Sequence, residues 1–86
     1  MNITQHIEHV YLQYPDKAAL IFEGNSFTYR ELNEKVNRVA NGLCDLQVGR
    51  GDRVALFLPN IPAFAIAYMG VLKIGAIAVS LNSSLK

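Results

Sequence analysis

The second half of the chain carries almost no charge, and this feature constrains the fold more than any other. From Val54 to the end of the 86-residue sequence, the only charged side chains are Lys73 and Lys86. Charged residues make up 17% of the whole chain, whereas a typical soluble domain carries about 25%. Apolar side chains at this density are stable only when most of them are buried away from water. We therefore expect more chain, or a partner, to cover this half.

The same region has the pattern of a strand, a helix and a second strand. Residues 54–58 are an apolar run without alternation, which is typical of a strand buried on both faces. Pro62 stands near the start of a predicted helix, residues 63–74, that is apolar nearly all round and is expected to be deeply buried. Gly75 ends this helix, and residues 76–81 form the second buried strand.

This order predicts a right-handed parallel crossover unit, and the fold class is therefore α/β. Two parallel strands leave both sheet edges unpaired. We therefore expect the chain to be a piece of a larger sheet-and-helix domain.

Residues 61–81 are also close to the length that spans a bilayer. Three features argue against a span. Pro62 lies near its start, Lys73 lies past its middle, and Gly75 interrupts it. We expect no transmembrane segment.

The first half predicts a helix followed by a hairpin. Apolar residues recur at helical spacing from Ile3 to Tyr14, and Pro15 ends the helix. Residues 18–23 suit a strand, Gly24-Asn25 is a two-residue turn signal, and residues 26–28 return as a second strand.

A capping box starts the next helix. The Thr28 hydroxyl can accept from the amide of Glu31, and the Glu31 carboxylate can accept from the amide of Thr28. The apolar stripe of this helix contains Leu32, Val36, Val39, Ala40, Leu43 and Leu46.

Four further expectations concern this helix. Ion pairs are predicted between Glu31 and Lys35 and between Glu34 and Arg38. Gly49 is the predicted terminator. Gly42 lowers helix stability relative to alanine, so a close packing contact is expected to require it.

No residue of the sequence stands out as catalytic, cofactor-binding or metal-binding. Gly49-Arg50-Gly51 follows a helix and precedes a strand, the reverse of a phosphate loop, and is interpreted as a turn. His6 and His9 are expected to face solvent. Cys44 is the single cysteine, so no internal disulfide can form, and no basic partner lies near it in sequence.

The charge of the chain bears on its partners, and its N-terminal sequence bears on its location. The net charge is +1 and the basic residues are scattered, so nothing indicates nucleic acid. Residues 1–4 lack a basic stretch followed by an apolar run, so we expect no signal peptide and a cytoplasmic location.

Several motifs, in order, resemble the opening of the adenylate-forming (AMP-binding) superfamily. Residues 27–32 (Phe-Thr-Tyr-Arg-Glu-Leu) resemble its first core motif, and residues 72–76 (Leu-Lys-Ile-Gly-Ala) its second. Three further stretches resemble the family: residues 14–20, residues 48–55, and Leu-Pro-Asn at 58–60 followed by Pro62. The resemblance runs from about Ile3 to Asn82. Ser80 and Ser83 stand where the family usually has proline, and Asn82 favours the acyl-CoA synthetase branch.

The resemblance implies a parent enzyme that activates a carboxylic acid as acyl-AMP and transfers it to coenzyme A, using ATP and Mg. It implies that residues 1–86 are an incomplete N-terminal segment of the large domain. The family's phosphate loop, ribose-binding acid and adenylation lysine match nothing in this sequence. The chain alone is therefore expected to be inactive, with no catalytic, cofactor-binding or metal site of its own.

Two other interpretations stay open. The chain could be a non-catalytic remnant or interaction module that completes a partner's sheet. It could also be a small membrane-associated protein that uses residues 61–81. For the isolated chain we expect self-association through residues 54–81, with a homodimer as its form.

Overall fold

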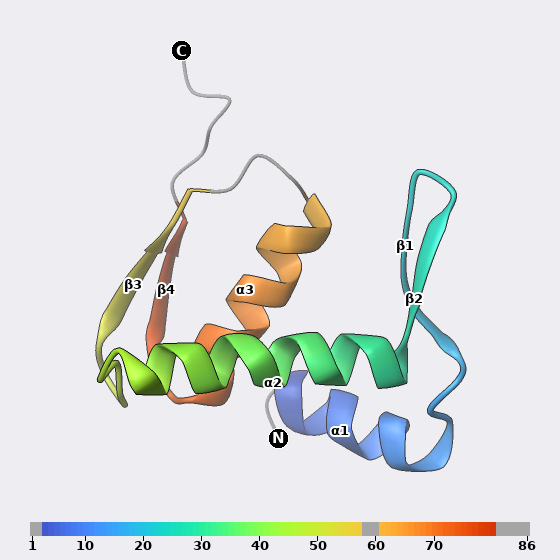
Figure 1. Cartoon of the computed structure of the whole chain (residues 1–86), viewed down its shortest axis with the longest axis horizontal. Helices are drawn as coiled ribbons and strands as arrows, with labels where there is room; N and C mark the ends of the chain where they lie inside the picture. The colour runs from blue at the N-terminus through green and yellow to red at the C-terminus, as the bar shows by residue number, and fades with distance from the viewer. Residues whose placement is uncertain (1–2, 58–60, 81–86) are drawn as a thin grey trace.

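The computed structural model describes residues 3–57 and 61–80 (Figure 1). These residues form three helices and four short strands. In chain order they are α1 (Ile3–Gln13), β1 (Ala18–Phe22), β2 (Asn25–Thr28), α2 (Tyr29–Asp45), β3 (Arg53–Leu56), α3 (Ile61–Lys73) and β4 (Ile77–Ser80).

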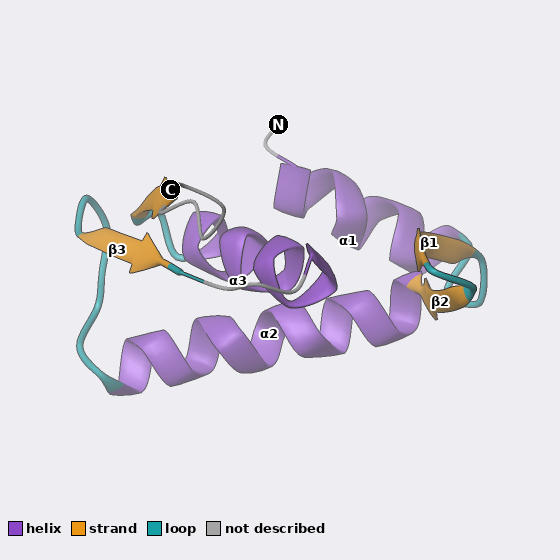
Figure 2. Ribbon diagram, turned by 90° about the horizontal axis from the view of Figure 1, so that it is seen from above, coloured by secondary structure: helices purple, strands orange, loops and turns teal. Residues whose placement is uncertain are grey.

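Helix α2 is the axis of the structure. The hairpin β1–β2 stands at its N-terminal end and the β3–β4 pair at its C-terminal end (Figure 1). Helix α3 crosses α2 between these two small sheets, and α1 packs against both helices (Figure 2). Two buried clusters result. One contains Ile7, Leu32 and Val36, and the other contains Leu56, Val71 and Ala76.

The parallel strand-helix-strand unit is confirmed. Strands β3 and β4 pair in parallel, with Arg53 opposite Ile77 and Leu56 opposite Ser80, and α3 connects them. The predicted strands extend to residues 58 and 81, which lie outside the described residues. Within the described ranges, no helix combines the length and the hydrophobicity that crossing a membrane requires.

Burial on both faces of these strands was predicted, and the structure shows burial on one face. Leu56 is buried and Val54 and Ala78 pack against the same cluster, whereas Ala55, Ile77 and Val79 are exposed. Helix α3 covers only the inner face, and no described segment covers the other. The helix is likewise less buried than its composition predicted, with Gly70 and Val71 as its buried positions among those described.

The hairpin turn lies one residue earlier than predicted. Phe22 pairs with Asn25, so Glu23 and Gly24 form the turn. Their φ angles are 50° and 80°. Two consecutive positive φ angles match the two-residue turns whose twist suits paired strands. The sequence favours Gly24-Asn25 because both residues tolerate such angles, and the strand register decides against it.

The capping box forms as predicted. The amide of Glu31 donates to Thr28 Oγ1 at 3.1 Å, and the amide of Thr28 donates to Glu31 Oε1 at 2.9 Å. Two backbone amides at the helix start thereby gain acceptors inside the protein. The segment between α1 and β1 also contacts the first turn of α2, because the amide of Tyr29 donates to the Lys17 carbonyl at 3.0 Å.

Thr28→Ala is expected to lower the free energy of unfolding by about 1 kcal/mol, the usual loss for an N-cap. Thr28→Ser keeps an accepting hydroxyl and should retain most of the stability. Urea denaturation of the three proteins checks this. A Thr28→Ala midpoint equal to that of the parent would show that the capping box contributes nothing.

Gly49 is not the residue that ends α2. The helix stops at Asp45, and Gln47 adopts the left-handed conformation with φ 65°. The amide of Gln47 donates to the Cys44 carbonyl at 2.9 Å, and the amide of Val48 donates to the Leu43 carbonyl at 3.0 Å. This bond pair defines a Schellman motif. Sequence reasoning missed it because glutamine rarely takes a position that favours glycine.

Helix α3 ends in the same way, with the expected glycine. Gly75 has φ 79°, its amide donates to the Leu72 carbonyl at 3.0 Å, and the amide of Ala76 donates to the Val71 carbonyl at 3.2 Å. Val71 and Ala76 then meet in the buried cluster, the apolar contact that accompanies this motif. The predicted stop at Gly75 is confirmed.

The close packing contact expected at Gly42 is found at Gly70. A Cβ added at Gly42 would meet nothing within 4 Å, whereas one added at Gly70 would lie 2.4 Å from Val39 Cγ1 and 2.7 Å from Val39 Cβ. Gly70 therefore sets how closely α2 and α3 can approach.

The two predicted ion pairs of α2 are absent from the described residues. The Glu31 carboxylate caps the helix instead, and Lys35 Nζ lies 5.9 Å from the centroid of the Phe27 ring. The apolar stripe of α2 is confirmed at Leu32, Val36 and Ala40, which are buried. Its last predicted member, Leu46, lies just past the end of the helix and is 76% exposed.

Candidate functional site

The histidines and the cysteine lie on two different helices. His6 and His9 are exposed on α1, as predicted, and Cys44 is exposed on α2 as a free thiol. Residues 3–57 and 61–80 contain no group of three His, Cys, Asp or Glu side chains that could hold a metal ion. The assignment of no catalytic, cofactor-binding or metal residue to this chain stays a prediction.

The Gly49-Arg50-Gly51 segment is a turn, as interpreted from the sequence, and the amides of its two glycines are engaged within the protein. The amide of Gly49 donates to Asp52 Oδ2 at 2.7 Å, and the amide of Gly51 donates to the Gly75 carbonyl at 3.0 Å. The amide of Asp52 donates back to the Gly49 carbonyl at 3.1 Å. The two glycine amides are therefore not available to a phosphate group.

The exposure of the outer face of β3–β4 is the largest difference between the structure and what the sequence predicts. We define this outer face as Arg53, Ala55, Phe57, Ile77 and Val79, which alternate with the inward-facing residues. Phe57 is 61% exposed, Ile77 48% and Val79 39%. Arg53 is the only charged residue among the five. An apolar strip of this kind on a parallel sheet is normally covered by another layer.

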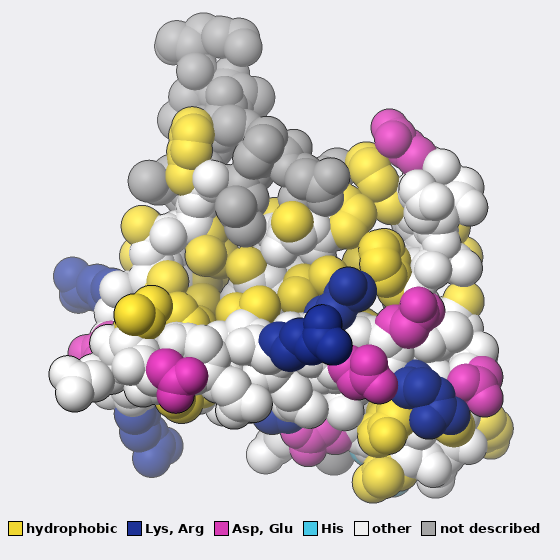
Figure 3. All heavy atoms as spheres, in the orientation of Figure 1, with side chains coloured by type: hydrophobic (Ala, Val, Ile, Leu, Met, Phe, Trp, Pro, Cys, Tyr) yellow, Lys and Arg dark blue, Asp and Glu magenta, His cyan; other side chains and the backbone are white. Residues whose placement is uncertain are grey.

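A second apolar region lies beside α3. Ile3, Phe64, Ala65, Tyr68, Met69 and Leu72 line an open hollow of about 510 Å³. The rings of Phe64 and Tyr68 stack with centroids 6.1 Å apart. Hydrophobic side chains gather over the middle of the molecule above α2 (Figure 3). Tyr68, in the helix that was expected to be deeply buried, is 39% exposed.

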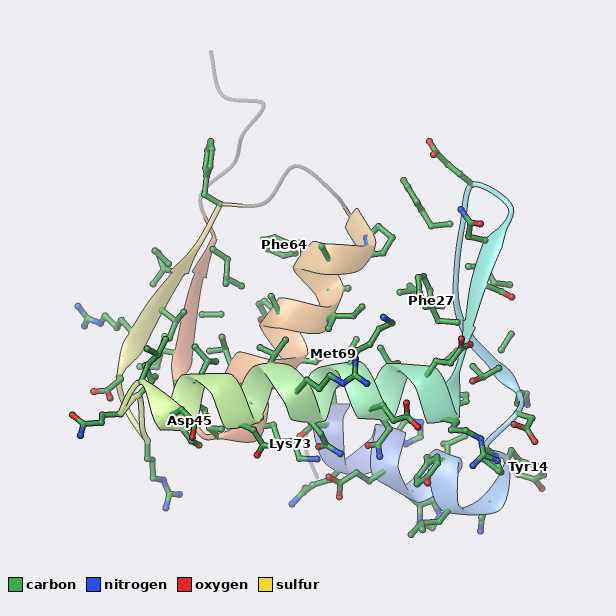
Figure 4. All side chains as sticks on the ribbon, viewed as in Figure 1. Tyr14, Phe27, Asp45, Phe64, Met69 and Lys73 are labelled. Atoms are coloured by element: carbon green, nitrogen blue, oxygen red, sulfur yellow. The ribbon has the colours of Figure 1, made fainter. Side chains whose placement is uncertain are left out.

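Lys73 of α3 links the three helices through polar contacts with Glu8 and Asn37, which we call the clasp. Its Nζ donates to Glu8 Oε1 of α1 and to Asn37 Oδ1 of α2. Figure 4 labels Lys73, whose side chain lies beside α2. The Lys73 side chain is only 25% exposed. Sequence reasoning singled out Lys73 as a lone charge within an apolar stretch and did not find this role. The signal was present, because a lone cation on a helix that packs on others needs partners.

Asp16 and Arg30 form an exposed ion pair at the start of α2. Arg30 Nε donates to Asp16 Oδ1 at 3.3 Å, and this hydrogen bond raises the pKa of Arg30 above its ordinary value. The guanidinium is already charged at every ordinary pH, so the shift gives no pH dependence to stability. The amide of Arg30 also donates to the Pro15 carbonyl at 2.8 Å, which fixes α1 and β1 to the first turn of α2.

The described residues thus make a structural platform. Two uncovered apolar regions flank α3, and the titratable groups do not converge on one point. This arrangement can support neighbouring chain.

Comparison with known proteins identifies what this platform resembles. The family model for AMP-binding enzymes matches residues 7–86. A crotonobetaine/carnitine–CoA ligase of Salmonella typhimurium is 44% identical over 89 residues, which cover 98% of this chain and 17% of that protein. The chain thus spans less than a fifth of this relative's length.

Solved structures agree in backbone as well. The N-terminal subdomain of Klebsiella oxytoca NpsA has a TM-score of 0.87 at 32% identity, covering 98% of this chain and 22% of that one. A fatty acyl CoA synthetase of Mycobacterium tuberculosis has a TM-score of 0.87 at 34% identity, covering 98% of this chain and 17% of that one. With matching sequence, fold and element order, the chain belongs to the AMP-binding enzyme family, as the motifs of the sequence indicated.

Proposed function

We propose that this chain is the N-terminal segment of the large domain of an ATP-dependent acyl-CoA ligase. The parent enzyme activates a carboxylic acid as acyl-AMP and then transfers the acyl group to coenzyme A. Two relatives named as a CoA ligase and an acyl CoA synthetase support this reaction class. A cytoplasmic location, with its ATP and coenzyme A, belongs to the same proposal.

The proposed role of residues 1–86 is structural. The outer face of β3–β4 carries this proposal, because its exposed apolar residues need a covering layer that no described segment supplies. The relatives are four to six times longer than the matched segment, which is consistent with further chain covering it. In this proposal α2 and α3 hold the sheet and the hairpin in place for the rest of the domain.

The residues present do not fit the family's cofactors. The two glycine amides of the Gly49–Gly51 turn are engaged, and the described residues offer no cluster for Mg. ATP, Mg and coenzyme A are therefore proposed to bind parts of the parent enzyme that follow this segment.

The isolated 86-residue chain is expected to show no ATP–pyrophosphate exchange with a panel of short-chain, long-chain and aromatic carboxylic acids. The reason is that the titratable side chains of the described residues do not converge on one site. Exchange above the background of a mock purification would contradict the assignment of catalysis to the rest of the enzyme.

A chimera supplies the positive arm of this test. The matching 89-residue segment of the Salmonella ligase is replaced by this chain, and exchange is measured with that enzyme's own acid substrate. We expect exchange to survive, because the segment supplies structure and no reacting group. A second chimera carrying Gly70→Ala is the control, and its exchange should fall together with its melting temperature. A folded first chimera without exchange would contradict the proposed structural role.

A further inference from the structure

We draw no further inference here: the strongest candidate, the open apolar hollow beside α3 that Ile3, Phe64, Tyr68 and Leu72 help to line, belongs to the surface already proposed to support neighbouring chain, and nothing in the structure shows what covers it.

Discussion

Gly70→Ala is expected to lower the free energy of unfolding by about 1–3 kcal/mol, the usual cost of overpacking a core. The new Cβ would lie 2.4 Å from Val39 Cγ1 and 2.7 Å from Val39 Cβ. Val39 is β-branched, with one strongly preferred rotamer in a helix, and its Cβ moves only with the backbone. The strain must therefore be relieved by moving α3 away from α2.

Gly42→Ala is the matched control for Gly70→Ala. It makes the same chemical change in the helix that α3 crosses, at an exposed position where the added Cβ meets nothing within 4 Å. It should raise stability by up to about 1 kcal/mol through helix propensity. Urea denaturation at low protein concentration, where association does not contribute, gives both values. Changes of the same sign would show that the α2–α3 crossing is not as tight as described.

Lys73→Met is expected to cost about 1–2 kcal/mol, less than a fully buried charged hydrogen bond because the pair is partly solvated. Methionine keeps the apolar stem and removes the ammonium that binds Glu8 and Asn37. Both partners then lose the donor that links them to α3. Added salt should narrow the difference between the two proteins, since partly exposed ion pairs are screened.

A double-mutant cycle separates the clasp from other effects of the substitution. Glu8→Gln alone and together with Lys73→Met should be less than additive, because the two residues share one interaction. Lys17→Met is the control, since Lys17 is exposed and should change stability by no more than about 0.5 kcal/mol. If Lys73→Met and Lys17→Met have equal effects, the clasp does not hold the helices together.

The sequence predicted the element order because local signals agreed with the fold. The Thr28–Glu31 capping box, the stripe centred on Leu32 and Val36, and the stop at Gly75 all depend on residues close in sequence. The pattern of residues 54–81 predicted the parallel unit for a similar reason, since an apolar helix between two apolar strands has few other folds. The family resemblance rested on the same motifs, and matching sequences and structures confirm it.

Two local positions and two that depend on distant residues were not predictable in this way. The turn at Glu23 and Gly24 is set by the pairing of Phe22 with Asn25, and the end of α2 by Gln47 adopting a conformation that glycine favours. The identity of the tight glycine depends on where α3 crosses α2, so Gly70 and Gly42 look alike in sequence. The partners of Lys73 come from two other helices for the same reason.

The degree of burial was the least predictable property. Composition reports how much apolar surface a segment carries, and it does not report whether the covering layer lies in the same stretch of chain. The exposed Ile77 and Val79 follow from that difference. The lack of converging reactive groups among the described residues fits the proposed structural role, because a segment that supports neighbouring chain needs no such groups.

The connections between strands have a consequence for the order of assembly. Strands β1 and β2 meet over a two-residue turn, whereas β3 and β4 pair across a connection that contains all of α3. Closing the longer connection costs more chain entropy, so this pairing is expected to come late in folding. Until then two apolar strands remain in water, which makes the nascent chain most prone to aggregation at that stage.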